Sequence, residues 1–105
     1  MRVRRKVVDG VLLVSVTGLL RATPRSIDMF QETTRMVAEE LTEVRVDLGG
    51  VLFVDSLWLG FLVSLALLCG EKGVAFTIAS ISKQVLRVVV DAHLDKALPA
   101  PLEVV

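Results

Sequence analysis

Hydrophobic and polar residues change their spacing along the chain, and each change marks a predicted element. Two runs rich in β-branched residues, Val3–Val8 and Val11–Thr17, flank the pair Asp9-Gly10. This pair suits a two-residue type I′ turn, so the chain is predicted to open with an antiparallel hairpin. The second run is almost continuously apolar, as in a strand covered on both faces, and Gly18 is expected to end it.

An amphipathic helix is predicted after the hairpin. Thr23 suits its N-cap, and Pro24 suits its first turn, where a missing N–H costs nothing. The following residues recur at helical spacing: Ile27, Phe30, Thr34, Val37 and Leu41. Charged side chains lie between them, so one face of this helix is expected to pack on an apolar surface.

The middle of the chain predicts a strand followed by a turn. Apolar and charged residues alternate over Val44–Leu48, which is typical of a strand with one covered face. Gly49-Gly50 is expected to form the turn before the short apolar segment Val51–Val54.

A long apolar helix is predicted next. The polar pair Asp55-Ser56 stands directly before the apolar run, as capping residues do, and Gly70 is expected as its C-terminal cap. This uncharged segment is shorter than the roughly 20 residues that span a bilayer, so a core helix is favoured over membrane insertion.

The last part of the chain predicts a strand, Val74–Ala79, and a helix over Lys83–Asp91 that Ser82 would cap. A final short strand over 102–105 is left open. The element order β-β-α-β-α-β-α indicates an α/β fold. We expect one domain over residues 1–105, with a mixed, mostly parallel sheet of four or five strands, an opening antiparallel hairpin and helices packed against the sheet.

Composition narrows the function. The 105 residues include twelve basic and twelve acidic side chains, so nothing indicates a nucleic-acid partner. The one basic cluster, Arg2 to Lys6, is typical of a solvated edge strand; a phosphate-binding role is its alternative. A single cysteine excludes an intrachain disulfide. A cytoplasmic protein is therefore expected.

Residues for catalysis are scarce. His93 is the only histidine and Cys69 the only cysteine, so no catalytic triad, metal-ligand set or nucleotide-binding motif is found. We therefore expect no enzyme, no cofactor and no metal; a small enzyme remains the third hypothesis.

Several residues in the second half follow a family pattern: Asp47-Leu48, Phe53, Asp55-Ser56, Leu59-Gly60, Lys72-Gly73, Ser82, Val85 and Leu86. With this element order, the chain resembles the STAS domain family, and within it the bacterial anti-sigma-factor antagonists. The resemblance implies a transcription regulator that binds an anti-sigma factor, itself a switch-type serine kinase. In that family a serine at the Asp-Ser junction is phosphorylated, and the phosphorylated form releases the partner.

The junction departs from the commonest family pattern. The second serine of Asp-Ser-Ser-Gly-Leu is the usual phosphoacceptor, and here Leu57 occupies that position. The resemblance therefore makes Ser56 the phosphorylation candidate, as in the stressosome scaffold proteins. Ser56 as a plain helix cap is the alternative.

A partner-binding region is expected around the junction: Asp55, Ser56, Leu57, Trp58, Gly60 and Phe61. Trp58 could be a binding hot spot or a buried core residue. The stripe Ser56, Gly60 and Ser64 would let another helix approach closely, which suggests a homodimer. The alternative function is an accessory STAS subunit of an ABC-type membrane transport system.

Overall fold

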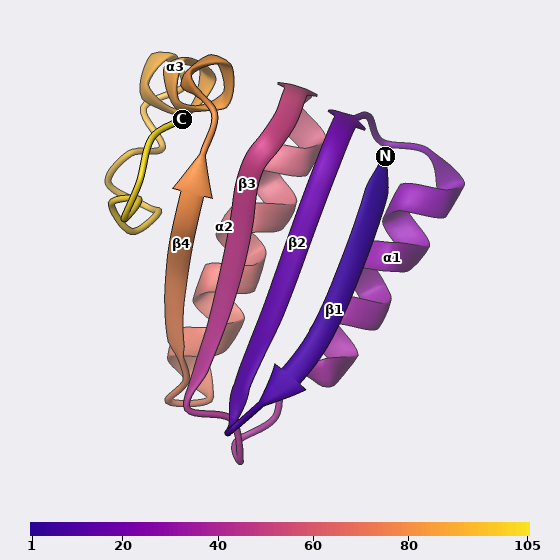
Figure 1. Cartoon of the computed structure of the whole chain (residues 1–105), viewed down its shortest axis with the longest axis vertical. Helices are drawn as coiled ribbons and strands as arrows, with labels where there is room; N and C mark the ends of the chain where they lie inside the picture. Colours follow the sequence, from indigo (N-terminus) through magenta and orange to yellow (C-terminus); the bar gives the residue numbers. More distant parts are fainter.

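A four-stranded sheet in the order β1-β2-β3-β4 organises the chain (Figure 1). The computed structural model describes every residue from 1 to 105. The strands are β1 (Arg2–Val8), β2 (Val11–Leu20), β3 (Glu43–Val54) and β4 (Ala75–Ile81), and the helices are α1 (Pro24–Met36), α2 (Ser56–Glu71) and α3 (Lys83–Asp91). β1 is antiparallel to β2, whereas β2, β3 and β4 run parallel. The predicted α/β class with a mostly parallel sheet is confirmed.

The opening hairpin closes as its sequence predicts. Asp9 and Gly10 both have positive φ, 50° and 79°, which a type I′ turn requires of its two central residues. Val8 and Val11 face each other directly on either side of this turn. The turn therefore fixes the register of the whole β1–β2 ladder.

Both crossover helices cover the same face of the sheet. Figure 1 shows α2 behind the strands, α1 alongside β1 and α3 at the end of β4, and the ring of Phe30 in α1 packs edge-on against that of Trp58 in α2. Consecutive parallel strands joined by right-handed crossovers must place their helices on one side. The core lies between, and its fully buried residues include Leu12, Val44 and Ile78. The opposite face, around Leu13 and Ser15, forms an open depression.

Two glycine predictions for the strands are wrong. Gly18 does not end β2; it adopts φ 94° at a register shift, and the strand continues to Leu20. Gly49-Gly50 is not a turn either, because β3 continues through it to Val54. The β2–β3 register shifts at both places, each time with one extra residue on β3, and the strands continue across the irregularity.

The helix boundaries are partly as predicted. Thr23 caps α1 through a capping box with Ser26, but α1 ends at Met36 rather than continuing along the apolar stripe to Leu41. The buried residues of this helix are Ser26 and Thr33, so its inward face is more polar than expected.

The later elements follow the prediction more closely. Ser82 caps α3, whose bounds, Lys83–Asp91, are as predicted. Gly70 lies inside α2 and is not its C-terminal cap, which is Lys72. The glycine that adopts a positive φ just after this helix is Gly73, at 70°. β4 begins and ends slightly later than predicted. The final segment makes one isolated bridge, between Val104 and Ile81, and adds no full strand.

Candidate functional site

The junction of β3 and α2 is organised by the carboxylate of Asp55. One oxygen, Oδ1, accepts the backbone N–H of Trp58 at 2.9 Å and so caps α2. The other oxygen, Oδ2, accepts the backbone N–H of Ala22 at 2.7 Å. The backbone N–H of Asp55 donates to the carbonyl of Leu20 at 3.1 Å. Asp55 thus joins the end of β2 to the start of α2.

Ser56 is the first residue of α2, and it is not the cap. Asp55 holds the capping position, so the interpretation of Ser56 as a plain cap is wrong. Ser56 is exposed, and its hydroxyl makes no hydrogen bond within the chain. The hydroxyl is therefore free for modification, beside backbone N–H groups at a helix N-terminus that favour negative charge.

Trp58 belongs to the core. Its side chain is 5% exposed, and its indole N–H donates to the carbonyl of Arg21 at 3.2 Å. The ring centroid lies 6.5 Å from that of Phe30 and 5.4 Å from that of Phe61, both edge-on. Phe30 and Phe61 stack at 4.3 Å. Of the two alternatives for Trp58, the structure therefore supports the buried core residue. Its ring is the centre of an aromatic cluster that joins α1 to α2.

The six residues of the expected binding region therefore separate into layers. Ser56, Leu57 and Gly60 are exposed, while Asp55 and Phe61 are half-buried. Trp58 is buried and cannot meet a partner without rearrangement of the fold, and the exposed residues are the most accessible ones.

Three further apolar residues lie exposed at the same junction, and sequence reasoning missed them. Leu52 is 63% exposed, and Leu19 and Phe53 face each other across β2 and β3 with both side chains exposed. The guanidinium of Arg21 lies 5.6 Å from the Phe53 ring centroid. Together with Leu57, which is 48% exposed, Leu19, Leu52 and Phe53 form what we call the junction surface. Apolar residues such as these are expected to be buried, so the sequence provided no indication that they would be exposed.

The outward face of α2 continues from this surface. Ser56, Gly60 and Ser64, the predicted stripe, are all exposed, and so is Leu67 one turn further. No charged residue occurs between Ser56 and Gly70. A solvent-facing helix surface without charge is unusual for a soluble protein.

Cys69 is fully buried on the inward face of α2, and burial raises the pKa of its thiol. The neutral thiol is a poor nucleophile, so this residue serves packing.

The family comparisons agree with this architecture. The family model described as the STAS domain matches residues 2–104. The structure is similar to the crystal structure of an anti-sigma factor antagonist from Mycobacterium paratuberculosis, with a TM-score of 0.74 and 24% sequence identity, over 93% of this chain and 82% of that chain. That likeness shows a shared fold. The search of curated proteins gives no match. None of the helices has the length and apolar character needed to cross a membrane. On the strength of the family model, this chain belongs to the STAS domain family.

Proposed function

We propose that this chain is a non-enzymatic regulatory module that binds a partner protein through the junction surface, in the manner of an anti-sigma-factor antagonist. The expected partner is an anti-sigma factor that is also a switch-type serine kinase. Membership of the STAS family and the fold shared with an anti-sigma factor antagonist support this proposal. The observation that carries it is an exposed serine, with a hydroxyl that makes no hydrogen bond, next to Leu57 and within a few residues of the exposed Leu52 and Phe53.

The junction surface has the composition of a docking site. Monomeric proteins rarely gather large apolar side chains in one exposed area without a binding function. Here Leu52, Phe53 and Leu57 are exposed within a few residues of Ser56. The aromatic cluster beneath α2 holds the helix in place, so the surface is formed before the partner arrives. A preformed surface lowers the entropic cost of binding.

Phosphorylation of Ser56 would act as the switch. A phosphate on Ser56 adds close to two negative charges directly beside Leu57 of the junction surface, where a docked partner would have to desolvate them. The carboxylate of Asp55 is the neighbouring side chain and would repel them further. The helix N-terminus favours the same phosphate in the free protein. Modification would therefore weaken docking and leave the fold intact.

The proposal can be tested by affinity capture from the source cell with matched baits. Wild-type protein, Leu57→Asp, Ser56→Asp and the control Leu102→Asp are compared; Leu102 is an exposed leucine outside the junction surface. Captured proteins and the state of Ser56 are identified by mass spectrometry, and circular dichroism confirms folding. We expect wild type and the control to capture a small ATP-binding kinase, and both junction variants to lose it at least ten-fold.

Two results would contradict this function. Equal capture by Leu57→Asp and wild type would remove the junction surface as the docking site. Recovery of a transporter ATPase or permease, with Ser56 unmodified, would make the chain an accessory subunit of a membrane transport system.

The uncharged face of α2 also supports self-association. Gly60 and Ser64 lie between Leu57 and Leu67 on this face, so a second copy could approach closely at the centre and bury leucines at both ends. Sedimentation at increasing concentration tests this homodimer, and a monomer throughout would exclude it.

A further inference from the structure

The two edges of the sheet differ in whether their backbone groups have partners. The C-terminal segment covers the β4 edge: Leu102 donates its backbone N–H to Ile78 at 2.9 Å, and Val105 donates to Ile81 at 2.9 Å. Ile81 in turn donates to the carbonyl of Glu103 at 3.0 Å. β1, at the other edge, makes backbone hydrogen bonds to β2 alone. β1 is therefore the one open edge of the sheet.

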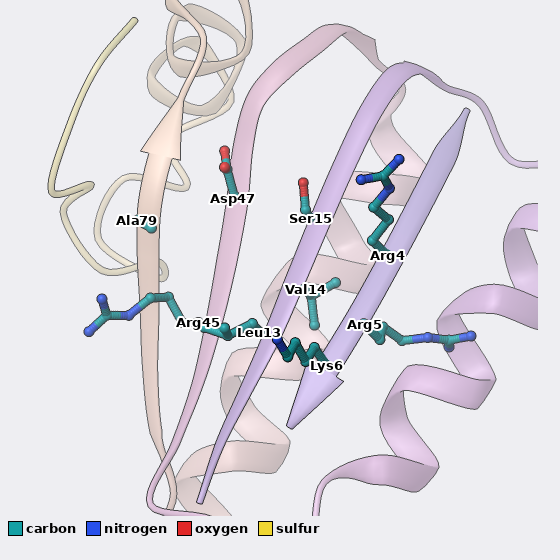
Figure 2. Close-up of a pocket in the computed structure, with 9 residues that line it drawn as sticks. All are labelled: Arg4, Arg5, Lys6, Leu13, Val14, Ser15, Arg45, Asp47 and Ala79. Atoms are coloured by element: carbon teal, nitrogen blue, oxygen red, sulfur yellow. The ribbon is translucent and has the colours of Figure 1, made fainter. Parts of the chain in front are cut away.

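Unpaired cations line this open edge. Arg2, Arg4 and Lys6 alternate along β1, are exposed and make no ion pair. In Figure 2, Arg4 and Lys6 stand over the open face of the sheet, whereas Arg5 points toward α1. Arg5 is used inside the fold, because its guanidinium pairs with Glu32 at 2.9 Å.

The nearest acidic groups do not neutralise these cations. β2, the neighbouring strand, contains no acidic residue. On β3, Glu43 is paired with Arg45 at 3.0 Å, and Asp47 accepts the backbone N–H of Gly49 at 2.9 Å. An open depression of about 670 Å³, lined in part by Leu13 and Ser15, lies on this face beside the cations (Figure 2). The depression leaves room beside β1 for the side chains of a bound strand.

We propose that the β1 edge binds an acidic, extended segment of a partner protein as an added strand. An exposed strand edge offers backbone N–H and C=O groups to such a segment. Alternate residues of a strand repeat at about 6.6–6.8 Å on one face, so acidic residues at alternate positions would face Arg2, Arg4 and Lys6. Opposite charges on neighbouring strands stabilise the pairing and accelerate encounter.

Charge argues against other occupants of this edge. A second copy would bring the same three cations against Arg2, Arg4 and Lys6, and like charges on adjacent strands destabilise pairing. The chain as a whole has a formal net charge of zero, which gives little attraction to a nucleic acid or an anionic membrane. A membrane surface would also leave the backbone groups of the edge unpaired.

The test uses two synthetic heptapeptides, Ac-TEVEVET-NH2 and its lysine counterpart Ac-TKVKVKT-NH2, at low ionic strength. Binding is followed by NMR shifts and amide exchange of the full chain. We expect the acidic peptide to bind at least ten-fold more tightly than the lysine peptide and to slow exchange of β1 amides. Charge reversal in R2E/R4E/K6E should invert this preference. The control R25E/K83E/R87E makes the same change in net charge at three exposed residues outside β1, and it should keep the preference for the acidic peptide.

Three outcomes would overturn the proposal: equal binding of both peptides, shifts confined to residues outside β1, or binding only to phosphatidylserine vesicles. The test is independent of the proposed docking at the junction surface, because Leu57→Asp should leave peptide binding unchanged.

Discussion

The side chain of Asp55 accepts the backbone N–H of Ala22 at 2.7 Å, so the residue that caps α2 also holds the loop leading into α1. The second carboxylate oxygen is occupied by the N–H of Trp58. The indole of Trp58 returns to the same loop through the carbonyl of Arg21. Two side chains of one junction therefore fix the loop from both directions, and Ser56 lies between them.

Replacing Asp55 should loosen this junction. Asp55→Ala removes both accepted hydrogen bonds, and we expect a loss of about 1–3 kcal/mol in the free energy of unfolding. Asp55→Asn keeps a single acceptor oxygen and should cost less. Urea denaturation measures both. Equal stability of Asp55→Ala and wild type would show that the two bonds contribute nothing net.

Substitutions of Trp58 should lower the stability of the fold rather than weaken partner binding directly. Trp58→Phe keeps an aromatic ring against Phe30 and Phe61 but loses the bond to Arg21, so we expect a cost of about 1–2 kcal/mol. Trp58→Ala opens a cavity and should cost about 3–5 kcal/mol. Partner capture by Trp58→Phe should match that of wild type when the variant is folded. A large loss of capture at retained stability would instead make the ring a direct contact.

Local chemistry was predictable where a hydrogen bond closes within a few residues. The caps Thr23 and Ser82 and the Asp9-Gly10 turn all satisfy backbone groups of their own segment, so the sequence alone indicates them. The element order followed from such signals together with the hydrophobic pattern, whereas the STAS family was indicated by a resemblance that includes the Asp55-Ser56 junction.

The features that could not be predicted from the sequence depend on how neighbouring strands pair. Gly18 and Gly49-Gly50 predict strand ends or turns on local propensity, but the pairing of β2 with β3 continues past them with a shifted register. A bulge interrupts the strict alternation of faces, and Leu52 and Phe53 are consequently both exposed. The junction surface therefore could not be predicted from the sequence pattern, because its exposure depends on register.

Acid pH should reveal the pairing of Glu43 with Arg45. Hydrogen bonds from the Arg45 guanidinium hold the pKa of Glu43 below its usual range. A carboxyl with a lowered folded pKa stabilises the protein above its unfolded pKa, and this contribution is lost as pH falls through the folded value. Arg45→Gln should raise the pKa of Glu43 and flatten the acid dependence of stability.

NMR titration of the Glu43 side chain measures this change directly. Arg45 is exposed and Glu43 is half-buried, so we expect a modest effect that added salt weakens further. Arg87→Gln, on α3, is the control and should leave the titration of Glu43 as in wild type. An unaltered titration in Arg45→Gln would remove Arg45 as the cause.

Gly60→Ala separates the stability of one copy from self-association. A Cβ added at Gly60 meets no atom within 4 Å, so the monomer should gain about 0.5–1 kcal/mol from higher helix propensity. Gly50→Ala is the contrasting control, because its Cβ would lie 2.7 Å from Cγ2 of Thr17 and should destabilise the protein. If α2 forms a homodimer, the methyl of Gly60→Ala prevents close approach and shifts sedimentation toward the monomer. Higher stability with unchanged self-association would place Gly60 outside any interface.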